Sequence, residues 1–357
     1  MKIKTISIHF ILKEWLLILS IFGLITTTIY TKKLPSYCME DLEIIFILFI
    51  LFIVINGLQR SGLIFRISQL IENGEVIPLK LILTTFFLSM IITNDVALIV
   101  IVPLTLALNI DKKGIIVILE ALSANAGSAL TPIGNPQNLF IYWFYNIPID
   151  KFIITIAPFS FIFLILLIVS TIFIKAKIII TNKTTIKIEK KAYIYMILLI
   201  IVLLTVLHIL PIYIGFIVVI FAILFDKKVL KIDYSLLLSF LFFFGIAENL
   251  EIIFNSELTN SKHIFLLSAL VSQVMSNVPT TLLFAKFTSN WEALLWGVNS
   301  GGFGSLFGSL ANLIAYKLYI SHPSSNDKLT FTINFFLIGY ISLCISFLIY
   351  PIISIGL

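Results

Sequence analysis

Long apolar runs separated by short polar segments dominate the pattern of this chain. A helix needs about 20 residues to cross the hydrocarbon core of a bilayer. Runs of that length or nearly so occupy residues 42–57 with their flanks, 151–174, 192–210 and 331–352. Together with the remaining apolar runs, they predict an all-α integral membrane protein with about nine transmembrane spans.

Two pairs of apolar arms are too short to be separate spans. One pair flanks the polar tip Thr93-Asn94-Asp95 and the other flanks Ser276-Asn277. Each arm of the first pair has about 14 residues, so at 1.5 Å per residue it reaches only about 21 Å. We therefore predict two re-entrant hairpins, over 79–110 and 263–288.

A polar, glycine-rich interruption follows each hairpin inside an apolar segment, which predicts broken helices over 115–145 and 292–320. The stretches 124–139 and 298–313 align without a gap. Identical pairs are Asn125/Asn299, Gly127/Gly301, Gly134/Gly308, Asn138/Asn312 and Leu139/Leu313. Corresponding broken segments in two halves indicate inverted repeats with a binding site between them. We assign the first repeat to 1–174 and the second to 192–357.

The basic loop 175–191, which joins these two repeats, sets the expected orientation. It carries six lysines and one glutamate, and loops rich in lysine and arginine stay in the cytoplasm. Counting spans from this loop places the N-terminus in the cytoplasm and opens the two hairpins to opposite sides. We expect a multi-pass protein of the cell (inner) membrane.

Composition agrees with a lipid environment. Of the residues, 60% are hydrophobic and 12% charged, whereas soluble domains are about a quarter charged. The two cysteines and four histidines show no disulfide or metal spacing, and no Walker motif or nucleophile–base–acid cluster is present. We therefore predict neither an enzyme nor an ATP-driven pump, no nucleic-acid partner, and no cofactor beyond sodium or a proton as coupling ion.

Polar side chains at the tips and breaks form the candidate site. Half-helix ends inside a bilayer offer N-terminal dipoles to an anion and freed carbonyl groups to a cation. Coupling-ion candidates are Thr93, Asn94, Asp95, Ser276 and Asn277, with sodium considered at Asn94, Asp95 and Asn277. Substrate-binding candidates are Asn125, Gly127, Ser128, Thr131, Gly134, Asn135, Asn138, Thr280, Asn299, Gly301, Ser305 and Asn312.

Several of the polar residues allow two interpretations. Asp95 either takes the coupling sodium or proton, or caps the helix that follows; an ionisable group inside a membrane is functional by default, which favours coupling. Asn277 is also an ordinary helix start, and its equivalence to Asn94 brings it into the site. Glu120 is either a second proton carrier or the partner of a lysine. Lys286 either attracts anions or extends its ammonium group from the membrane toward water, and we favour the second interpretation.

The motif Thr93-Asn94-Asp95-Val96-Ala97-Leu98, followed by Gly134-Asn135-Pro136-Gln137-Asn138, resembles the ion-transporter superfamily. Members are arsenite-efflux permeases, NhaD-type sodium/proton antiporters, citrate-transporter-like permeases and divalent-anion/sodium symporters. The second half is similar through Ser276-Asn277 and Ala311-Asn312-Leu313. The resemblance spans residues from about 42 to 352. It implies an elevator-type carrier, often a homodimer, that binds ion and substrate between the two tips and the two breaks.

The tips depart from one branch of this superfamily. Divalent-anion symporters carry Ser-Asn-Thr at both tips, whereas the third positions here are Asp95 and Val278. The first tip is closer to the arsenite, NhaD and small anion-permease branches. We predict an ion-coupled anion permease of the citrate-transporter-like type, driven by sodium or protons, that contacts lipid and a small ion. Alternatives are a sodium/proton antiporter, an arsenite-efflux permease and, in a different class, a non-transport membrane subunit.

Overall fold

The computed structural model describes residues 14–63, 76–110, 112–174, 178–179, 189–254, 261–322 and 327–353. Within these ranges the chain is almost entirely helical, which confirms the all-α prediction. The exceptions are two strands, β1 (Asn109–Ile110) and β2 (Ile178–Ile179), which pair antiparallel. The N-terminus predicted to be cytoplasmic and most of the basic loop 175–191 lie outside the described residues.

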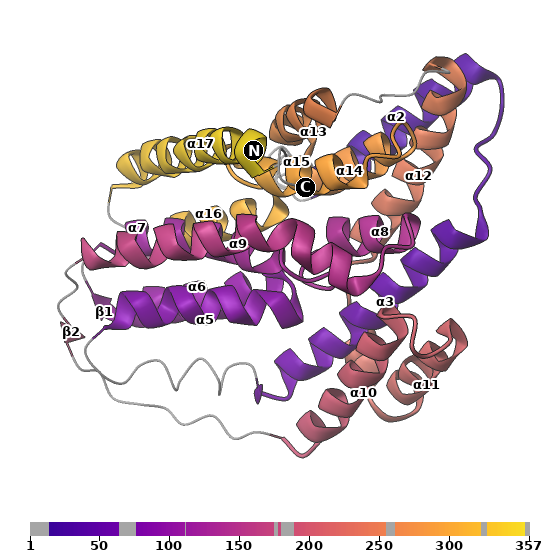
Figure 1. Cartoon of the computed structure of the whole chain (residues 1–357). Coiled ribbons are helices and arrows are strands. Elements are labelled where there is room, and N and C mark those ends of the chain that lie inside the picture. Colours follow the sequence, from indigo (N-terminus) through magenta and orange to yellow (C-terminus); the bar gives the residue numbers. More distant parts are fainter. Residues whose placement is uncertain are drawn as a thin grey trace, which may run out of the picture.

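Short connections join most of the helices (Figure 1). The first part of the chain forms α2 (Trp15–Thr31), α3 (Met39–Arg60), α5 (Ile77–Ile92), α6 (Asn94–Ala107), α7 (Lys113–Ser128), α8 (Pro136–Phe144) and α9 (Ile149–Ile172). The second part forms α10 (Lys191–Val206), η2 (Ile212–Gly215), α11 (Phe216–Phe225), η3 (Lys227–Leu230), α12 (Tyr234–Phe254), α13 (Ser261–Met275), α14 (Asn277–Ala285), α15 (Trp291–Gly301), α16 (Leu310–Ser321) and α17 (Lys328–Ile353).

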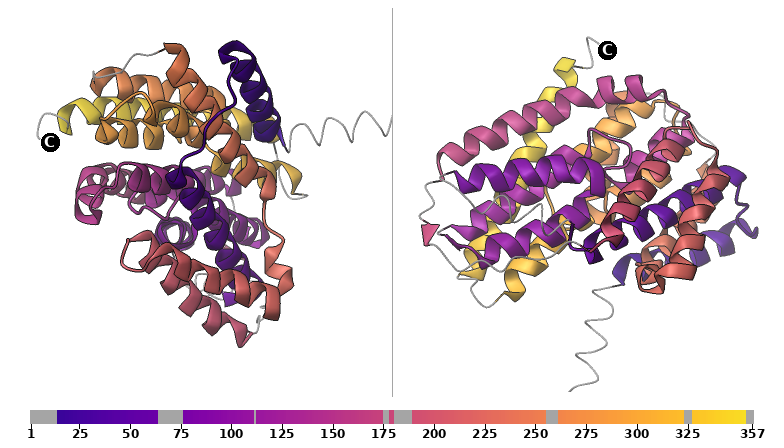
Figure 2. Two further views of the ribbon diagram at one scale, coloured as in Figure 1. Left: turned by 90° about the vertical axis from the view of Figure 1, so that its right-hand side faces the viewer. Right: turned by 90° about the horizontal axis from the view of Figure 1, so that it is seen from below.

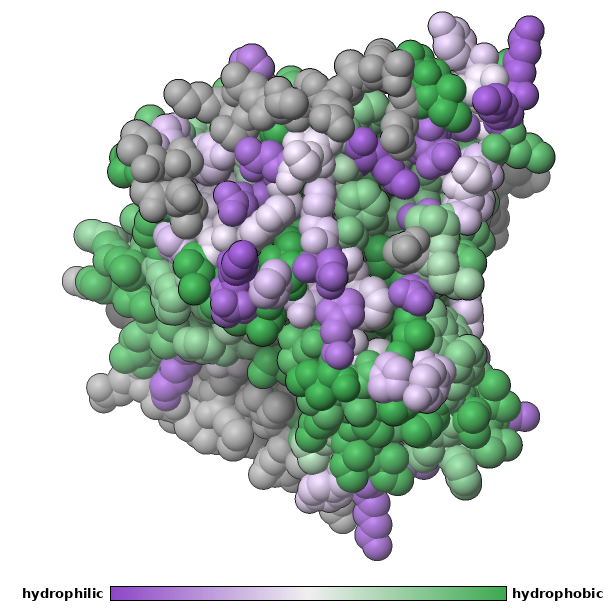
Figure 3. Space-filling model, turned by 45° about the vertical axis from the view of Figure 1, so that its right-hand side comes forward, coloured by the Kyte–Doolittle hydropathy of each residue, from purple (hydrophilic) through white to green (hydrophobic). Residues whose placement is uncertain are grey.

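The outer surface of the helices suits lipid rather than water. Among the described helices, three are long and apolar enough to cross a bilayer: Asp41–Arg60, Ile149–Ile172 and Lys328–Ile353. Large apolar side chains such as Ile165 and Leu337 are more than half exposed on them, and Figure 3 shows broad apolar areas on one face. Soluble proteins rarely expose apolar areas of this extent, so the chain is a membrane protein with several spans.

Each predicted hairpin is a pair of helices that meet at one residue. Thr93 alone separates α5 from α6, and Ser276 alone separates α13 from α14. The φ angles of these two residues are 78° and 74°, which non-glycine residues rarely adopt. No α-helix continues through such a residue, so the chain turns at both tips, and α5 and α6 lie side by side (Figure 1).

Each predicted broken helix is interrupted, at glycine and proline residues in the first half and at glycine residues in the second. The first helix stops at Ser128 and resumes at Pro136, and the second stops at Gly301 and resumes at Leu310. Proline at the first position of α8 costs no hydrogen bond, because that N–H has no partner inside the helix. The breaks therefore follow from local sequence.

In each half, one glycine allows the hairpin to lie close against the neighbouring broken helix. A Cβ atom on Gly127 of α7 would lie 2.2 Å from the carbonyl oxygen of Phe86 on α5. A Cβ atom on Gly301 of α15 would lie 2.9 Å from the carbonyl oxygen of Ala269 on α13. Backbone atoms cannot swing aside as side chains can, so only glycine fits at Gly127, and Gly301 is nearly as restricted.

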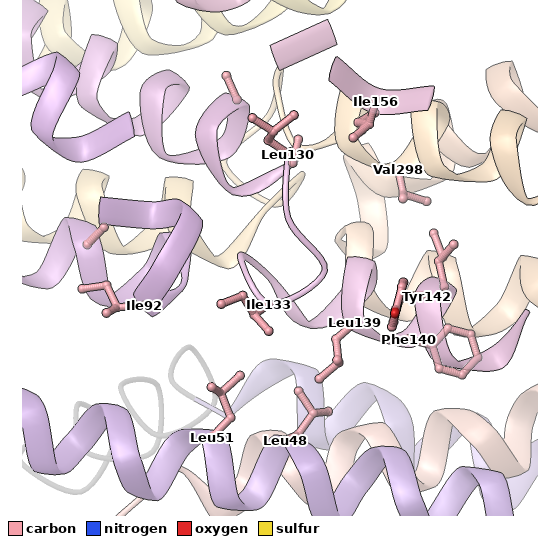
Figure 4. Close-up of a cluster of buried hydrophobic side chains, with 14 of the residues drawn as sticks. Leu48, Leu51, Ile92, Leu130, Ile133, Leu139, Phe140, Tyr142, Ile156 and Val298 are labelled. Atoms are coloured by element: carbon pink, nitrogen blue, oxygen red, sulfur yellow. The ribbon is translucent and has the colours of Figure 1, made fainter. Parts of the chain in front are cut away.

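A continuous apolar core joins the first break to the rest of the bundle. In Figure 4, Leu48 and Leu51 of α3 point toward Ile133 and Leu139 in and after the break. All four side chains belong to one cluster of buried residues. The apolar contacts hold the interrupted segment from one side, so its polar groups face the other helices of the bundle.

The two parts of the chain interleave at the breaks. In the left view of Figure 2, the helices from α13 onward form one layer and the helices α5–α9 form another, with α10 and α11 packed beside α3. Contacts of α16 with α6 and α7, and of α14 with α8, connect the layers. Segments far apart in sequence therefore meet where the breaks lie.

Replacing Gly127 by alanine tests this close packing. We expect Gly127→Ala to lower the free energy of unfolding by about 1–3 kcal/mol, because the added methyl group overpacks the contact with the α5 backbone. Thermal unfolding of the purified protein in detergent measures the change. Gly23→Ala is the control: its methyl group meets only the flexible end of Ile246, and we expect a change below about 1 kcal/mol. Equal effects of the two substitutions would contradict the close-packing explanation.

Candidate functional site

Four helices begin at one small cavity. Its wall contains the first residues of α6 (Asn94 and Asp95), α8 (Pro136 and Gln137), α14 (Asn277 and Val278) and α16 (Leu310), together with Ser276, Ser309 and two apolar residues of α12, Leu236 and Phe240. Its volume of about 20 Å³ leaves room for about one water-sized solute. The arrangement directs four positive helix ends at a space that fits a single small ion.

Both tips are anchored to the breaks by equivalent backbone hydrogen bonds. The amide of Asn94 donates to the carbonyl of Gly134 at 3.0 Å, and the amide of Asn277 donates to the carbonyl of Gly308 at 3.0 Å. The sequence alignment already paired these two glycines with each other. The first residue of each hairpin's second helix is therefore fixed against the break of its own half.

The residue just before each of these anchors is strained. Thr93 and Ser276 have ψ angles of 149° and 155° with positive φ. This region of backbone conformation is nearly confined to glycine, and it costs on the order of 1–3 kcal/mol for other residues. Such strain persists only where surrounding contacts hold it, and it gathers at functional sites. Backbone strain at both tips therefore indicates a functional site there, independently of the cavity.

Asparagine side chains join the two halves behind the cavity. Nδ2 of Asn125 donates to Oδ1 of Asn312, and Nδ2 of Asn299 donates to Oδ1 of Asn138, both at 2.8 Å. Nδ2 of Asn94 donates to Oδ1 of Asn125 at 3.1 Å, which adds the first tip to the network. The four asparagines that flank the breaks form two aligned pairs, so each half makes the same contact to the other.

The same asparagines hold the unwound backbone. Nδ2 of Asn138 lies 3.2, 2.9 and 3.3 Å from the carbonyl oxygens of Ser128, Ala129 and Thr131. Nδ2 of Asn312 lies 2.9 and 3.0 Å from those of Gly302 and Ser305. Carbonyl groups freed by a helix break need partners where water is absent. These two side chains supply them.

Hydroxyl groups attach each break to the first arm of its hairpin. Oγ1 of Thr131 donates to the carbonyl of Met90 at 2.6 Å, and Oγ of Ser305 donates to the carbonyl of Gln273 at 2.8 Å. The side chain of Gln273 adds two bonds in the second half: Nε2 donates to the carbonyl of Gly301, and Oε1 accepts from the amide of Ser305. Sequence reasoning missed Gln273 because it lies inside an apolar arm. The signal that could have found it is a polar residue about one helical turn before the tip residue Ser276.

The other hydroxyl and amide candidates serve as local caps. Oδ1 of Asn135 accepts from the amide of Asn138 at the start of α8, and its Nδ2 donates to Oγ of Ser128 at 3.1 Å. Oγ of Ser309 accepts from the amide of Ala311 at the start of α16. Oγ1 of Thr280 donates to the carbonyl of Ser276. These contacts order the helix ends that point at the cavity.

The structure thus separates the candidates into two groups. Of the coupling-ion candidates, Asn94, Asp95, Ser276 and Asn277 line the cavity. Thr93 precedes Asn94 in the chain and is not among the lining residues. The substrate-binding candidates Asn125, Gly127, Ser128, Thr131, Gly134, Asn135, Asn138, Thr280, Asn299, Gly301, Ser305 and Asn312 are not among its lining residues. Four of them, Asn125, Asn138, Asn299 and Asn312, form the hydrogen-bonded asparagine frame described above. Next to the breaks, the wall consists of Pro136, Gln137, Ser309 and Leu310.

Asp95 is the one acidic residue among those that line the cavity. Its Oδ1 is buried and has no hydrogen-bond partner. The N-cap position of α6 belongs to Thr93, and Asp95 follows as the second residue of the helix without a capping side-chain bond. The alternative prediction, that Asp95 is the N-cap of this helix, is therefore wrong. An unpartnered carboxylate that faces a cavity of ion size is free to take a cation or a proton.

Two further ionisable residues lie away from the cavity. Glu120 of α7 is fully buried, with one oxygen accepting a hydrogen bond from Thr105 and the other, Oε2, without a partner. Neither ion pair found among the described residues involves it, so the predicted alternative of a lysine partner is not seen. Lys286 forms a partly buried ion pair with Glu248 of α12 at 3.7 Å, with side chains 15% and 26% exposed.

Comparison with known proteins finds transporters among the relatives of this chain. The model of a family described as a citrate transporter matches residues 13–297. An uncharacterized transporter of Methanocaldococcus jannaschii is 38% identical over 319 residues, which cover 85% of this chain and 88% of that protein. Inner membrane protein YbiR of Escherichia coli is 36% identical over 256 residues, covering 67% and 68%. The silicon efflux transporter LSI3 of Oryza sativa subsp. japonica is 32% identical over 131 residues, covering 34% and 27%.

Exchanging Asn138 for aspartate tests the role of the frame. Asn138→Asp keeps the size and the acceptor for Asn299 but removes the donor to three carbonyl oxygens. We expect the free energy of unfolding to fall by about 3 kcal/mol or more, because buried acceptors are left unpaired beside a carboxylate. Thermal melting in detergent reports this. Asn146→Asp on the exposed turn after α8 is the matched control, expected to change it by less than about 0.5 kcal/mol. Similar melting temperatures for both variants would refute the structural role.

Proposed function

This chain belongs to the citrate transporter family, and we propose that it is an ion-coupled secondary transporter that moves a small anion with sodium or a proton. The observation that carries the proposal is the meeting of four helix N-termini and one unpartnered carboxylate at a single cavity. A membrane enzyme would need an acid–base or metal constellation there. A structural subunit would have no use for strained tips and interrupted helices in both halves.

Charge balance gives the proposed coupling a physical basis. Each helix N-terminus carries roughly half a positive charge, so four of them offset about two negative charges. Asp95 supplies one of these charges when it is ionised. A proton or a sodium ion on Asp95 cancels that charge and leaves the helix ends to stabilise the anion. Binding of the cation and of the anion would then reinforce each other, which is the requirement for symport.

The residues divide between ion, substrate and frame in this proposal. Asp95, with the side-chain oxygens of Asn94, Ser276 and Asn277, holds the coupling ion. The substrate anion is held by the helix ends after the two breaks, and the asparagine frame fixes those ends in place. A cavity of about 20 Å³ is far too small for citrate. We infer that the tips must separate from the breaks to admit substrate.

We also propose the arrangement that makes such a site transport. The equivalent contacts of the two halves support two inverted repeats, 1–174 and 192–357, each with a re-entrant hairpin and a broken helix. The name of the E. coli relative, inner membrane protein YbiR, supports a location in the inner membrane. We further propose that the basic loop and the N-terminus lie in the cytoplasm. An elevator-type movement of the hairpins and breaks, and a homodimer, remain predictions from the superfamily resemblance.

Removing the carboxylate tests the coupling role. In proteoliposomes that take up labelled citrate, we expect Asp95→Asn to lose the dependence of uptake on the sodium or pH gradient. A loss of about tenfold or more would match the removal of about 1.4 kcal/mol of coupling. Asp150→Asn is the control, because Asp150 occupies the same position in the first turn of α9 and is exposed. Unchanged gradient dependence in Asp95→Asn would remove Asp95 from the mechanism.

A sodium/proton antiporter is the second candidate, and the cavity itself favours it. The volume fits one ion, the carboxylate is unpartnered, and no lysine or arginine lines the wall in the described part of the chain. Asp95 would then bind sodium and a proton in turn, with no anion involved.

The two candidates predict opposite results in vesicles without any anion substrate. For an antiporter we expect the internal pH, read with a trapped dye, to change when sodium is added outside, and Asp95→Asn to abolish the change. For the symporter we expect no change until citrate or another substrate is supplied. Thermal stabilisation by sodium, citrate, sulfate, phosphate, arsenite and a soluble form of silicon would identify that substrate, because a ligand of the folded state raises its stability.

A further inference from the structure

A second polar pocket lies where the end of α3, the start of α10 and the turn between α11 and η3 meet. Its volume is about 220 Å³, roughly ten times that of the cavity at the tips. No residue of the candidate transport site lines it. Because α3 is one of the helices long enough to cross a bilayer and ends at Arg60, the pocket lies where such a helix leaves the membrane.

The wall of this pocket is fixed by packing and hydrogen bonds. The ring of Tyr195 packs against Gly57, where a Cβ atom would come within 2.2 Å of a ring carbon. The hydroxyl of Tyr195 donates to Oδ2 of Asp226 at 3.0 Å, and Nζ of Lys191 lies 3.2 Å from the same oxygen. Three separate segments are held together in this way, so the pocket does not depend on a ligand for its shape.

The charges in the pocket leave a positive surplus. Burial alone would raise the pKa of Asp226, but hydrogen bonds from Lys191 and the neighbouring tyrosine hold the pKa of this carboxyl below its usual value, so it is ionised and already paired. The side chains of Arg60 and Lys228 make no hydrogen bond or ion pair within the described part of the chain. Against them stands one further acid, Glu189.

Exposed apolar surface begins directly beside these charges. Leu224 and Phe225, which precede Asp226, are each 67% exposed, and Ile194 and Ile197 of α10 are 40% and 60% exposed. A free inorganic anion would use only the cationic part of this surface. A lipid would use both parts, with its headgroup in the pocket and its acyl chains along α10 and α11.

We propose that this pocket binds the phosphate group of an anionic membrane lipid. The guanidinium group of Arg60 offers a planar fork of donors that matches two phosphate oxygens, and Lys228 adds a second cation. Basic pockets at the cytoplasmic ends of membrane helices suit such headgroups. This site is separate from the transport cavity, so it stands whether or not the proposed transport function does.

Native mass spectrometry of the detergent-purified chain, incubated with equal amounts of phosphatidylglycerol and phosphatidylcholine, tests the proposal. We expect the wild type to retain phosphatidylglycerol in preference. The double variant Arg60→Gln, Lys228→Gln is expected to lose about fivefold in preference for each charge removed. Lys151→Gln, which removes an exposed lysine at the start of α9, should retain the wild-type preference.

Two further arms keep the test decisive. Arg60→Lys preserves the charge but not the fork, so it should lose part of the preference even if the double variant fails to fold. Inorganic phosphate added alone should not raise the melting temperature of the wild type. If it does so while phosphatidylglycerol does not, the pocket serves a free anion and the lipid proposal is wrong. Equal lipid preference in the wild type and a folded double variant also overturns it.

Discussion

Carbonyl groups freed at the two helix breaks must find partners within the protein, because the middle of a bilayer offers no water. Asn138 and Asn312 meet this requirement, each donating to the backbone that has just left its helix. Their own acceptor oxygens are satisfied from the opposite half, by Asn299 and Asn125. The pairing that stabilises each break therefore also binds the two halves together, and the position of the cavity follows from it.

The need to pair these freed carbonyl groups explains why few polar side chains line the cavity. Most amides and hydroxyls of the tips and breaks are used in caps and in the frame, so they fix the helix ends instead of lining the cavity. What remains there is the positive end of four helices, a few side-chain oxygens and the carboxylate of Asp95. In the proposed mechanism, binding would therefore come mainly from backbone dipoles, whose direction depends on the asparagine frame.

Sequence reasoning located the tips and breaks because a polar residue inside an apolar run is conspicuous. It could not divide those residues between cavity and frame, since that depends on the direction in which each side chain points after folding. It also missed Leu236 and Phe240, which close the cavity from α12. They look like ordinary residues of a span, and only tertiary packing brings them to the tips. The ion pair between Lys286 and Glu248 was missed for the same reason.

The equivalence of the two halves breaks down where it matters for charge. At the tips, Asn94 and Asn277 make the same backbone contact, yet the next residue is Asp95 in one half and Val278 in the other. Two-fold equivalent carboxylates would place two negative charges in one small cavity, where they would repel each other at close range. A single carboxylate leaves about half of the helix-end charge unused. In the proposed symport mechanism, this unused positive charge stabilises the substrate anion. One cation bound to Asp95 neutralises the carboxylate and so doubles the positive charge that the anion meets.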